Sequence, residues 1–505
     1  MFPHSPITFS TMDEPLECIL WLLLLLFLVL IADGARRIFK LQSTTTRRFV
    51  HVVVALAVPW APFLFHDAFY PELLGLILIV VNFLSLRFGM FKGINVEKND
   101  YGTVYYPASF FIFVVLLWNK EPFVVSIAML VMGLGDPAAA IVGTSLHDTH
   151  RIPAFGEHKT LEGSVTMFVV SSISVFVGLT VLGGYFPALA AISIYSSVSI
   201  SLSIGIMVAA VELVSPRATD NLSVPLVAGL LAYTAVTTPS SFEGFIVGEL
   251  LAALVAIVSY RLKFLSSDGA FATFIAGSFI FGFGGWEWAI PILTFFVIGT
   301  VSSKLYSRRK AAYNLLYEEG PTRDSGQVFA NGGVGLLTLV GSMLAPNHHW
   351  FLAYVGSLAA VTADTVATEL GVFSRRDPFS PTAWQRVAKG TSGGISLYGS
   401  AAGLIGVASL SALALPLAGV YSLHVVRFIA VGAISGAVGS LADSILGGTI
   451  QAQYRCPACG KTTEKKKHCD DNGTKLTKGY RWVNNDVVNF AASLIGAVTM
   501  PMIFK

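Results

Sequence analysis

The sequence predicts an all-α, multi-pass membrane protein of roughly sixteen transmembrane helices, and three observations support this prediction. Apolar residues make up 54% of the 505 residues and charged residues only 12%, whereas ordinary soluble domains carry about 25% charged residues. The mean hydropathy is +0.68, and apolar runs long enough to cross a bilayer recur along the chain. This composition excludes a soluble or disordered protein. The small net charge of +3, spread over separate loops, gives no reason to expect a nucleic-acid partner.

The first apolar segment, residues 17–34, is expected to be a retained helix whose N-terminus lies outside. Acidic residues precede it and a basic cluster follows it, which reverses the charge order of a signal peptide. The other segments are expected at 48–65, 70–88, 104–119, 122–143, 162–183, 187–214, 223–239, 243–262, 268–284, 287–304, 329–345, 350–372, 393–415, 421–450 and 486–504.

Basic residues in the loops predict the topology. They gather in alternate loops, and Lys120 is nearly the only basic residue in the opposite set. Loops rich in lysine and arginine stay on the cytoplasmic side of a membrane. We therefore expect a multi-pass protein of a bacterial inner membrane, with its polar sites facing the cytoplasm.

Two series of polar residues follow each other along the chain in the same order, each containing an acid, then a lysine, then another acid. Asp136 and Lys159 are 23 positions apart, and Asp364 and Lys389 are 25 apart. The step from Lys159 to Glu212 is 53 positions, and the step from Lys389 to Asp443 is 54. The matched order predicts two tandem eight-helix halves, 1–240 and 241–505, with a small cytoplasmic insert at 453–483. Chance recurrence of glycine and alanine patterns is the alternative.

Charged residues near membrane depth usually face a cavity and serve function. Carboxylates can hold Mg²⁺ together with phosphate oxygens, and lysine and glycine-rich backbone N–H groups can neutralise phosphates. This combination predicts Mg²⁺-dependent phosphoryl or nucleotidyl transfer from a nucleotide to a membrane lipid. The sequence has no Walker A loop, because Gly460-Lys461-Thr462 lacks the earlier glycine of that motif.

The motifs carry a resemblance to two families. The first half resembles the phytol kinase/dolichol kinase family of CTP-dependent polyprenol kinases, through Arg48-Phe-Val-His51, Asp136…Gly143, Lys159-Thr-Leu-Glu-Gly-Ser164 and Glu212…Asp220-Asn221. The second half resembles the phytyl-phosphate kinase family, through Ser267-Asp-Gly269, Gly326…Gly333, Ala363-Asp-Thr365, Lys389…Gly394, Asp443…Gly447 and Asn485-Asp486.

The resemblance implies a bifunctional transferase with CTP as the phosphate donor. The first half would convert phytol or a related prenol to its monophosphate, and the second half would convert the monophosphate to the diphosphate. Such an enzyme would serve tocopherol and other prenyl-lipid synthesis or phytol salvage. Its partners would be the prenol, the prenyl phosphate and membrane lipid. The prenyl chain length, CTP against another nucleotide, the identity of any general base and the oligomeric state stay open.

Site residues can be assigned to roles on this basis. Catalytic roles are expected for Asp136, Lys159, Glu162, Glu212, Asp220, Asn221, Asp364, Glu369, Lys389, Asp443, Asn485 and Asp486. Mg²⁺ ligands are expected among Asp136, Glu212, Asp364 and Asp443. Nucleotide binding is expected from Gly143, Lys159, Thr160, Gly163, Ser164, Lys389, Thr391, Gly393 and Gly394, and substrate binding from Arg48, His51, Gln327 and Asn331.

Three of the four cysteines fall in one loop. Cys456-Pro-Ala-Cys459 resembles half of a zinc ribbon, and His468 and Cys469 could complete a four-ligand site. The second Cys-x-x-Cys of a ribbon is missing, so reduced thiols without metal are the alternative to a structural zinc clip.

Two other functions fit part of the pattern. A secondary transporter also combines repeats with charges inside the membrane, but carriers usually place them near the bilayer midplane. A CTP:lipid-phosphate cytidylyltransferase uses similar chemistry and differs in its product, a CDP-lipid.

Overall fold

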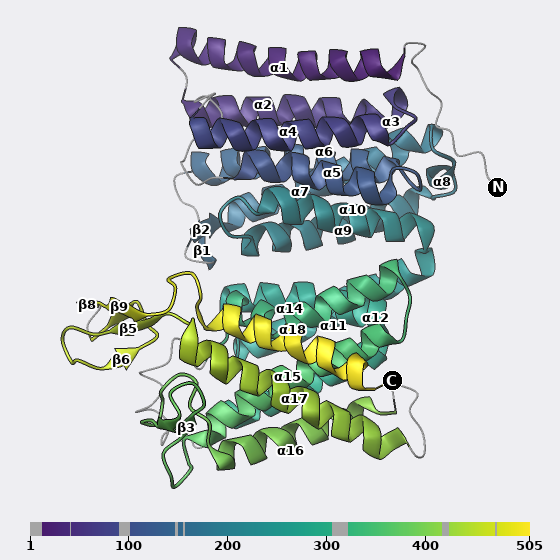
Figure 1. Ribbon diagram of the computed structural model, residues 1–505. Coiled ribbons are helices and arrows are strands. Elements are labelled where there is room, and N and C mark those ends of the chain that lie inside the picture. Colours follow the sequence, from purple (N-terminus) through teal and green to yellow (C-terminus); the bar gives the residue numbers. More distant parts are fainter. Residues whose placement is uncertain are drawn as a thin grey trace. The chain divides into compact units, whose positions relative to one another are not determined.

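The computed structural model describes residues 13–40, 42–89, 101–146, 150–154, 157–305, 322–416, 424–469 and 472–504. It is built mostly of helices (Figure 1). The chain divides into two compact units, Met1–Ile246 and Val247–Lys505, and helix α11 (Pro239–Arg261) runs from one into the other. The sequence places this boundary near residue 240; the separate activity of each half stays a prediction.

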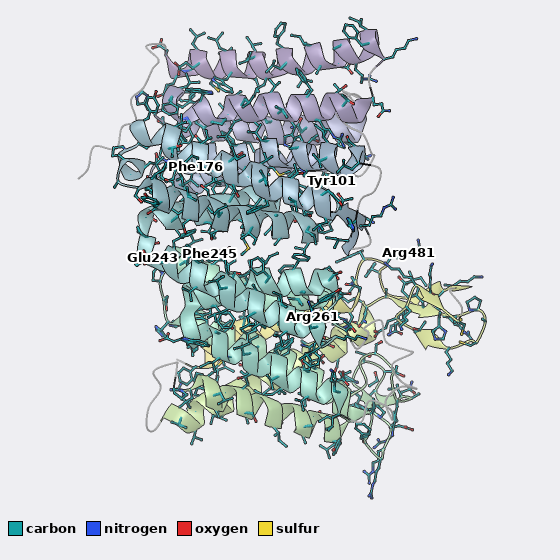
Figure 2. All side chains as sticks on the ribbon, turned by 180° about the vertical axis from the view of Figure 1, so that it is seen from behind. Tyr101, Phe176, Glu243, Phe245, Arg261 and Arg481 are labelled. Atoms are coloured by element: carbon teal, nitrogen blue, oxygen red, sulfur yellow. The ribbon has the colours of Figure 1, made fainter. Side chains whose placement is uncertain are left out.

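The first unit is organised around helix α6, whose Ile127, Met129 and Met132 are fully buried. Helices α2, α7 and α10 pack against it. Figure 2 shows Tyr101 and Phe176 toward opposite ends of this unit. Its elements are α1 (Glu14–Phe39), α2 (Ser43–Ala57), η1 (Val58–Trp60), α3 (Ala61–Leu64), α4 (Phe69–Phe88), α5 (Gly102–Leu117), α6 (Phe123–Ser145), β1 (Arg151–Ala154), β2 (Glu157–Thr160), α7 (Leu161–Val181), η2 (Leu182–Gly184), α8 (Pro187–Ala190), α9 (Ile194–Val214) and α10 (Asp220–Thr237).

The second unit is organised around helix α15, which packs against α12, α14, α16, α17 and α18. Small residues let these helices approach closely, and a side chain at Gly356 would collide with the backbone of Gly496. After α11 its elements are α12 (Ser267–Lys304), α14 (Ser325–Leu344), α15 (His349–Gly371), β3 (Phe379–Ser380), β4 (Gln385–Arg386), α16 (Leu397–Ala414), α17 (His424–Thr449), β5 (Gln453–Arg455), β6 (Thr462–Thr463), β7 (Lys467–His468), β8 (Asn472–Gly473), β9 (Lys475–Lys478) and α18 (Asn485–Ile503).

Helix α12 is a hairpin of two helices. A straight helix of its 38 residues would be about 57 Å long. Yet Lys304, its last residue, lies 3.7 Å from the ring centre of Phe264, just before its first turn. The chain reverses at Gly285, whose φ of 61° and ψ of −161° leave the helical region. The two halves coincide with the segments predicted at 268–284 and 287–304.

Twelve helices among the described residues have the length and apolar composition to cross a membrane: α1, α4, α6, α7 extended by η2, α9, α11, α12, α14, α15, α16, α17 and α18. Two apolar segments, Arg48–Leu64 and Gly102–Leu117, are shorter. The predicted number of sixteen is therefore not confirmed. Outward-facing apolar side chains, such as Phe27 at 59% exposure and Leu254 at 60%, suit contact with lipid.

Short strands occur outside the long helices, so the all-α prediction is correct only for the membrane part. Strands β1 and β2 pair as an antiparallel hairpin just before α7, and β3 and β4 pair between α15 and α16. Within the predicted insert at 453–483, β6, β5 and β9 form a three-stranded sheet, and β7 pairs with β8.

Candidate functional site

In the first unit, three predicted residues meet around one ammonium group. Lys159, in strand β2, donates to the Glu212 carboxylate at 2.5 Å and to the Glu212 carbonyl at 2.6 Å. Its Nζ also lies 3.5 Å from the Asp220 carboxylate. Strand β2, the end of α9 and the start of α10 supply one residue each. Because these side chains are only 18%, 11% and 11% exposed, the ion pairs are largely shielded from water.

The donor atoms of this group suit a divalent cation. Burial lowers the pKa of Lys159, but the neighbouring carboxylates of Glu212, Asp220 and Asp136 outweigh burial and raise the pKa overall. The lysine therefore stays protonated at neutral pH. Three carboxyl groups thus surround one ammonium group, and carboxyl oxygens are the ligands that Mg²⁺ prefers.

The substrate-binding residues predicted on α2 face α6. His51 Nδ1 lies 3.7 Å from the Asp136 carboxylate, and its ring makes an edge contact with Tyr106 at a centroid distance of 4.7 Å. Arg48 donates to the carbonyl of Ala140 at 3.4 Å. The structure thus brings both residues to the helix that carries Asp136.

The Lys-Thr-Leu-Glu-Gly-Ser motif forms the junction of β2 with α7. Thr160 caps α7 by accepting from the Gly163 backbone N–H at 3.2 Å. A side chain at Gly143 would come within 2.6 Å of the Thr160 hydroxyl, so glycine lets α6 approach this cap. Glu162 is not joined to the lysine: its carboxylate lies 2.8 Å from the His150 ring Nδ1 and accepts from the His150 backbone N–H. Phosphate binding by this junction stays a prediction.

Two further predicted residues lie near these groups. The Asn221 backbone and side-chain N–H groups both donate to the Asp220 carboxylate, at 3.0 and 3.1 Å, and orient it. The Ser164 hydroxyl is buried and has no hydrogen-bond partner among the described residues, so it is available to a ligand.

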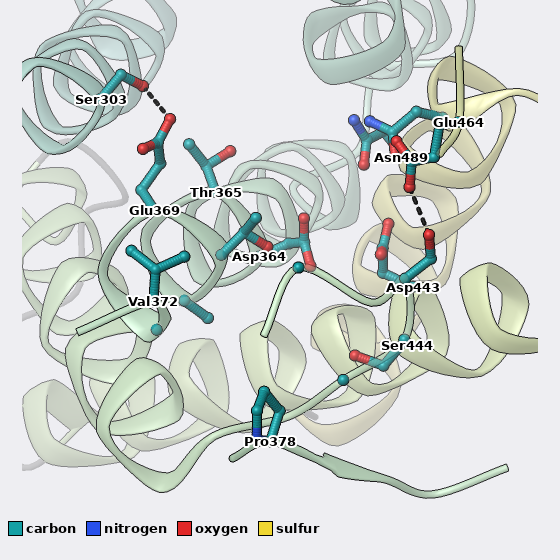
Figure 3. A pocket seen from close by; sticks show the side chains of 18 of the residues that line it. Ser303, Asp364, Thr365, Glu369, Val372, Pro378, Asp443, Ser444, Glu464 and Asn489 are labelled. Carbon is teal, nitrogen blue, oxygen red and sulfur yellow. Dashed lines mark hydrogen bonds between the residues drawn. The ribbon is translucent and has the colours of Figure 1, made fainter. Parts of the chain in front are cut away.

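Apart from the four predicted zinc ligands, ten of the eleven predicted site residues of the second unit line one cavity of about 200 Å³. Figure 3 shows part of its lining. The ten are Gln327, Asn331, Asp364, Glu369, Lys389, Thr391, Gly393, Gly394, Asp443 and Asn485. The eleventh, Asp486, instead accepts from the Asn484 side chain at 3.0 Å. The structure therefore brings ten predicted residues from five segments together around one cavity, and their roles stay predictions.

Carboxylates occupy two sides of the cavity. Asp364 of α15 lies within hydrogen-bonding reach of Asp443 of α17. Glu369 accepts from the Ser303 hydroxyl at 2.7 Å on the other side (Figure 3). Two adjacent carboxylates repel each other unless a proton or a cation lies between them. Asp364 and Asp443 thus fit the predicted role of Mg²⁺ ligands.

Lys389 starts the glycine-rich turn of the cavity and is held by backbone carbonyls. Its ammonium donates to the Ser374 carbonyl at 2.6 Å and to the Val372 carbonyl at 3.3 Å. Gly393 has a φ of 78°, and a side chain there would collide with the Ser444 carbonyl. Only glycine lets this turn rest against α17.

Three charged residues that line the cavity were not predicted as site residues: Lys304, Arg323 and Glu464. The Arg323 guanidinium lies over the rings of Phe295 and Phe296, at 5.5 and 5.8 Å. In the sequence, Lys304 and Arg323 count only among the basic residues that predict which loops face the cytoplasm. No motif marks either one as a site residue. Glu464 lies in the cysteine loop, 21 positions after Asp443, and no motif marks it as a site residue.

An apolar groove adjoins the polar cavity. It is a space of about 80 Å³ lined by α11, both halves of α12 and α14, with Val255, Ile280 and Phe281 among its walls. Arg323, Gln327 and Asn331 line both the groove and the cavity. A polar chamber and an apolar groove joined by an arginine and two amides can hold an amphipathic molecule.

The fold and these sites define an integral, multi-pass membrane protein with buried carboxylate sites. Residues 250–497 match the family model described as Integral membrane protein DUF92. The membrane protein MJ0933 of Methanocaldococcus jannaschii is 26% identical over 53% of this chain and 98% of its own length. Protein VTE6, chloroplastic, of Arabidopsis thaliana is 24% identical over 46% of this chain and 63% of its own. Phytol kinase of Synechocystis sp. is 28% identical over 41% of this chain and 85% of its own. No solved structure matches.

Proposed function

We propose that this protein is a membrane-embedded prenyl-lipid kinase whose second unit phosphorylates a lipid monophosphate. One observation carries the proposal: the polar cavity and the apolar groove share Arg323, Gln327 and Asn331. A phosphate head group beside Arg323 would leave a hydrocarbon chain in the groove. The similarity to a protein named Phytol kinase supports a prenol-derived substrate.

The cavity supplies the other groups that phosphoryl transfer needs. The turn from Lys389 to Gly394 would bind the nucleotide phosphates. Mg²⁺ held by Asp364 and Asp443 would neutralise charge on the transferred group. An oxygen of the lipid monophosphate forms the new bond to the terminal phosphorus of CTP, the bridging P–O bond breaks, and CDP leaves. The residues act by positioning and by neutralising charge, because this reaction demands little else of the protein.

For the first unit we propose the preceding step, transfer of a phosphoryl group from CTP to a prenol hydroxyl. The group of Lys159, Glu212, Asp220 and Asp136 would bind Mg²⁺ and nucleotide. A small apolar cavity of about 40 Å³ reaches Tyr106, whose ring contacts His51 beside Asp136. A prenol tail in that cavity would direct its hydroxyl toward the carboxylates.

Product analysis tests the proposal. The purified protein is incubated with Mg²⁺, CTP labelled in the γ-phosphate, and a panel of prenols and prenyl monophosphates. We expect labelled prenyl monophosphate from the alcohols, labelled diphosphate from the monophosphates, and unlabelled CDP. A CDP-lipid with labelled pyrophosphate would identify a cytidylyltransferase. Absence of turnover with lipid flux across vesicles would identify a transporter.

The proposed junction residue gives a sharper test. Arg323→Ala removes the guanidinium but keeps the backbone bonds of Arg323 to Phe264 and Ser266. Loss of a charge-assisted hydrogen bond should raise KM for the lipid monophosphate about 10- to 100-fold. Arg261→Ala, at the end of α11 and outside the described lining of both spaces, is the matched control. An unchanged KM in Arg323→Ala would place the head group elsewhere.

A further inference from the structure

Four metal-binding side chains converge in the loop between α17 and α18. One donor atom from each of Cys456, Cys459, His468 and Cys469 lies within 4.8 Å of the others. His468 Nδ1 is 3.5 Å from the Cys459 sulfur and 3.1 Å from the Cys469 sulfur. Zn–S bonds of about 2.3 Å and Zn–N bonds of about 2.0 Å in a tetrahedron separate their ligands by nearly these distances.

The backbone around the ligands is shaped for such a site. Cys456 is fully buried, and its backbone exchanges hydrogen bonds with Gly460 and Lys461 at 2.9 and 3.0 Å, which folds residues 456–461 into a tight turn. Cys469 has a φ of 49°, which sharply turns the chain and lets the adjacent His468 and Cys469 side chains reach one point. Adjacent side chains of an extended chain point to opposite sides, and this turn brings the two together.

Glu464 lies in sequence between Cys459 and His468, and its side chain lines the polar cavity of the second unit. It follows β6 directly, is 7% exposed, and lines the cavity beside Asp443 (Figure 3). Its carboxylate accepts from the Ser392 hydroxyl at 2.6 Å, across 72 positions of sequence. Ser392 belongs to the turn from Lys389 to Gly394. The cysteine loop thus touches the turn that the proposed function assigns to nucleotide phosphates.

We propose that these three cysteines and His468 bind one Zn²⁺, and that this ion fixes the loop so that Glu464 holds the turn through Ser392. The ion would close residues 460–467 into a loop with both ends anchored, which limits where Glu464 can lie. Zinc is then a structural clamp on a site that it does not touch. The metal site stands independently of the proposed function; only the effect on nucleotide use rests on it.

Metal analysis tests the first part. Protein purified without chelators should contain about one Zn²⁺ per chain, and Cys456→Ser/Cys459→Ser should contain none. Cys18→Ser, which removes the cysteine outside the loop, is the matched control and should keep the metal. Co²⁺ exchanged into the site should give the absorption of thiolate-bound cobalt. Metal-free protein that takes up neither ion would overturn the proposal, whether or not the protein is a kinase.

Amide hydrogen exchange tests the proposed clamp and requires no measurement of enzyme activity. Zinc removal from wild-type protein by a chelator should speed amide exchange in 456–469 and also in 389–394, since the loop no longer restrains the turn. Faster exchange confined to 456–469 would contradict the clamp. The chelated wild-type chain avoids dependence on a variant that fails to fold.

Kinetics tests what Glu464 does. Glu464→Gln should raise KM for the nucleotide about tenfold, because a charged hydrogen bond becomes a neutral one. Its kcat and its zinc content should stay nearly unchanged. Ser392→Ala should give the same KM, and the double variant no further rise, because both remove one interaction. If Glu464 only supported the fold, its substitution would lower kcat because fewer molecules would be active. A lower kcat, or KM effects of the two substitutions that add in the double variant, would reject the positioning role.

Discussion

Lys159 and Lys389 occupy the same place in the two polar series, yet the structure gives them different partners. Lys159 lies between the carboxylates of Glu212 and Asp220. Lys389 is held by the carbonyls of Val372 and Ser374, after the end of α15. The spacing to the next acid is 53 positions in one unit and 54 in the other. Similar spacing therefore brought each lysine to an acidic site without giving it the same contacts.

The local backbone explains the difference. Lys159 belongs to strand β2 and immediately precedes the cap of α7, so the hairpin directs it toward α9 and α10. Lys389 follows β4 and begins a turn in which Gly390 and Gly393 have positive φ. The chain stays non-helical from this turn to Ser396, which caps α16. The first lysine is locked in ion pairs, whereas the second is bound by neutral groups that a phosphate can replace more easily.

The largest expected effect is the loss of one reaction when one lysine is removed. Lys389→Ala should lower conversion of monophosphate to diphosphate about 10²- to 10³-fold, as loss of one charge-stabilising group does. Lys159→Ala should do the same to phosphorylation of the prenol. Each variant should keep the other activity, measured with the alcohol and the monophosphate supplied separately.

Stability separates the two lysines further. Lys159→Ala leaves buried carboxylates unpaired, which costs about 3–5 kcal/mol, whereas Lys389→Ala should cost about 1 kcal/mol. Lys159→Ala/Glu212→Gln should recover thermal stability but no prenol kinase activity. Loss of both activities in either well-folded variant would show one shared site instead of two.

Metal dependence is the next largest difference to measure. Asp364→Asn should raise the Mg²⁺ concentration for half-maximal diphosphate synthesis at least about tenfold, because a ligand charge is lost. Asp136→Asn should do so only for the monophosphate step. An unchanged Mg²⁺ dependence in Asp136→Asn would contradict a metal ligand role for Asp136. Lys159 would then be the main group that neutralises charge in the first site.

Narrowing the groove should have a smaller effect, confined to the second unit. Val255→Phe places a ring in the apolar groove, and KM for a long prenyl monophosphate should rise about tenfold. KM for a short one should stay close to the wild-type value. Val258→Phe lies on the same helix at a position 46% exposed and controls for the added ring. Equal effects of the two variants would remove the groove from substrate binding.

The smallest expected effect concerns pH. The pKa of Lys159 is raised above the ordinary 10.5, so the ammonium group keeps its charge below that value and loses it only as pH rises beyond it. The difference in melting temperature between wild type and Lys159→Met should therefore stay constant between about pH 6 and 9. Differential scanning fluorimetry in detergent measures it. A difference that shrinks across this range would mean that the lysine loses its proton within it.

Much of the fold and of the second cavity follows from local sequence. The separate segments predicted at 268–284 and 287–304 match the two halves of α12, and motifs with short internal spacing locate Asp364, Lys389 and Asp443. Glu464 and Arg323 could not be found in this way. Glu464 is placed by a hydrogen bond to Ser392, 72 positions away, and Arg323 by its contacts with the rings of Phe295 and Phe296. Neither kind of contact produces a recognisable pattern in the sequence. Four predicted spans account for the difference from the twelve helices that qualify. The hairpin of α12 counts once, the segments Arg48–Leu64 and Gly102–Leu117 are shorter, and α10 is not among the twelve.

The insert between α17 and α18 has a physiological consequence. Thiolates hold a metal only while they are reduced, and oxidation to disulfide or sulfenic acid removes them as ligands. The described part of the first unit has no comparable thiol cluster. On the proposed assignment, oxidative stress or zinc shortage would slow the second reaction alone and let the monophosphate build up. The ratio of the two products would then report the redox and metal status of the cell.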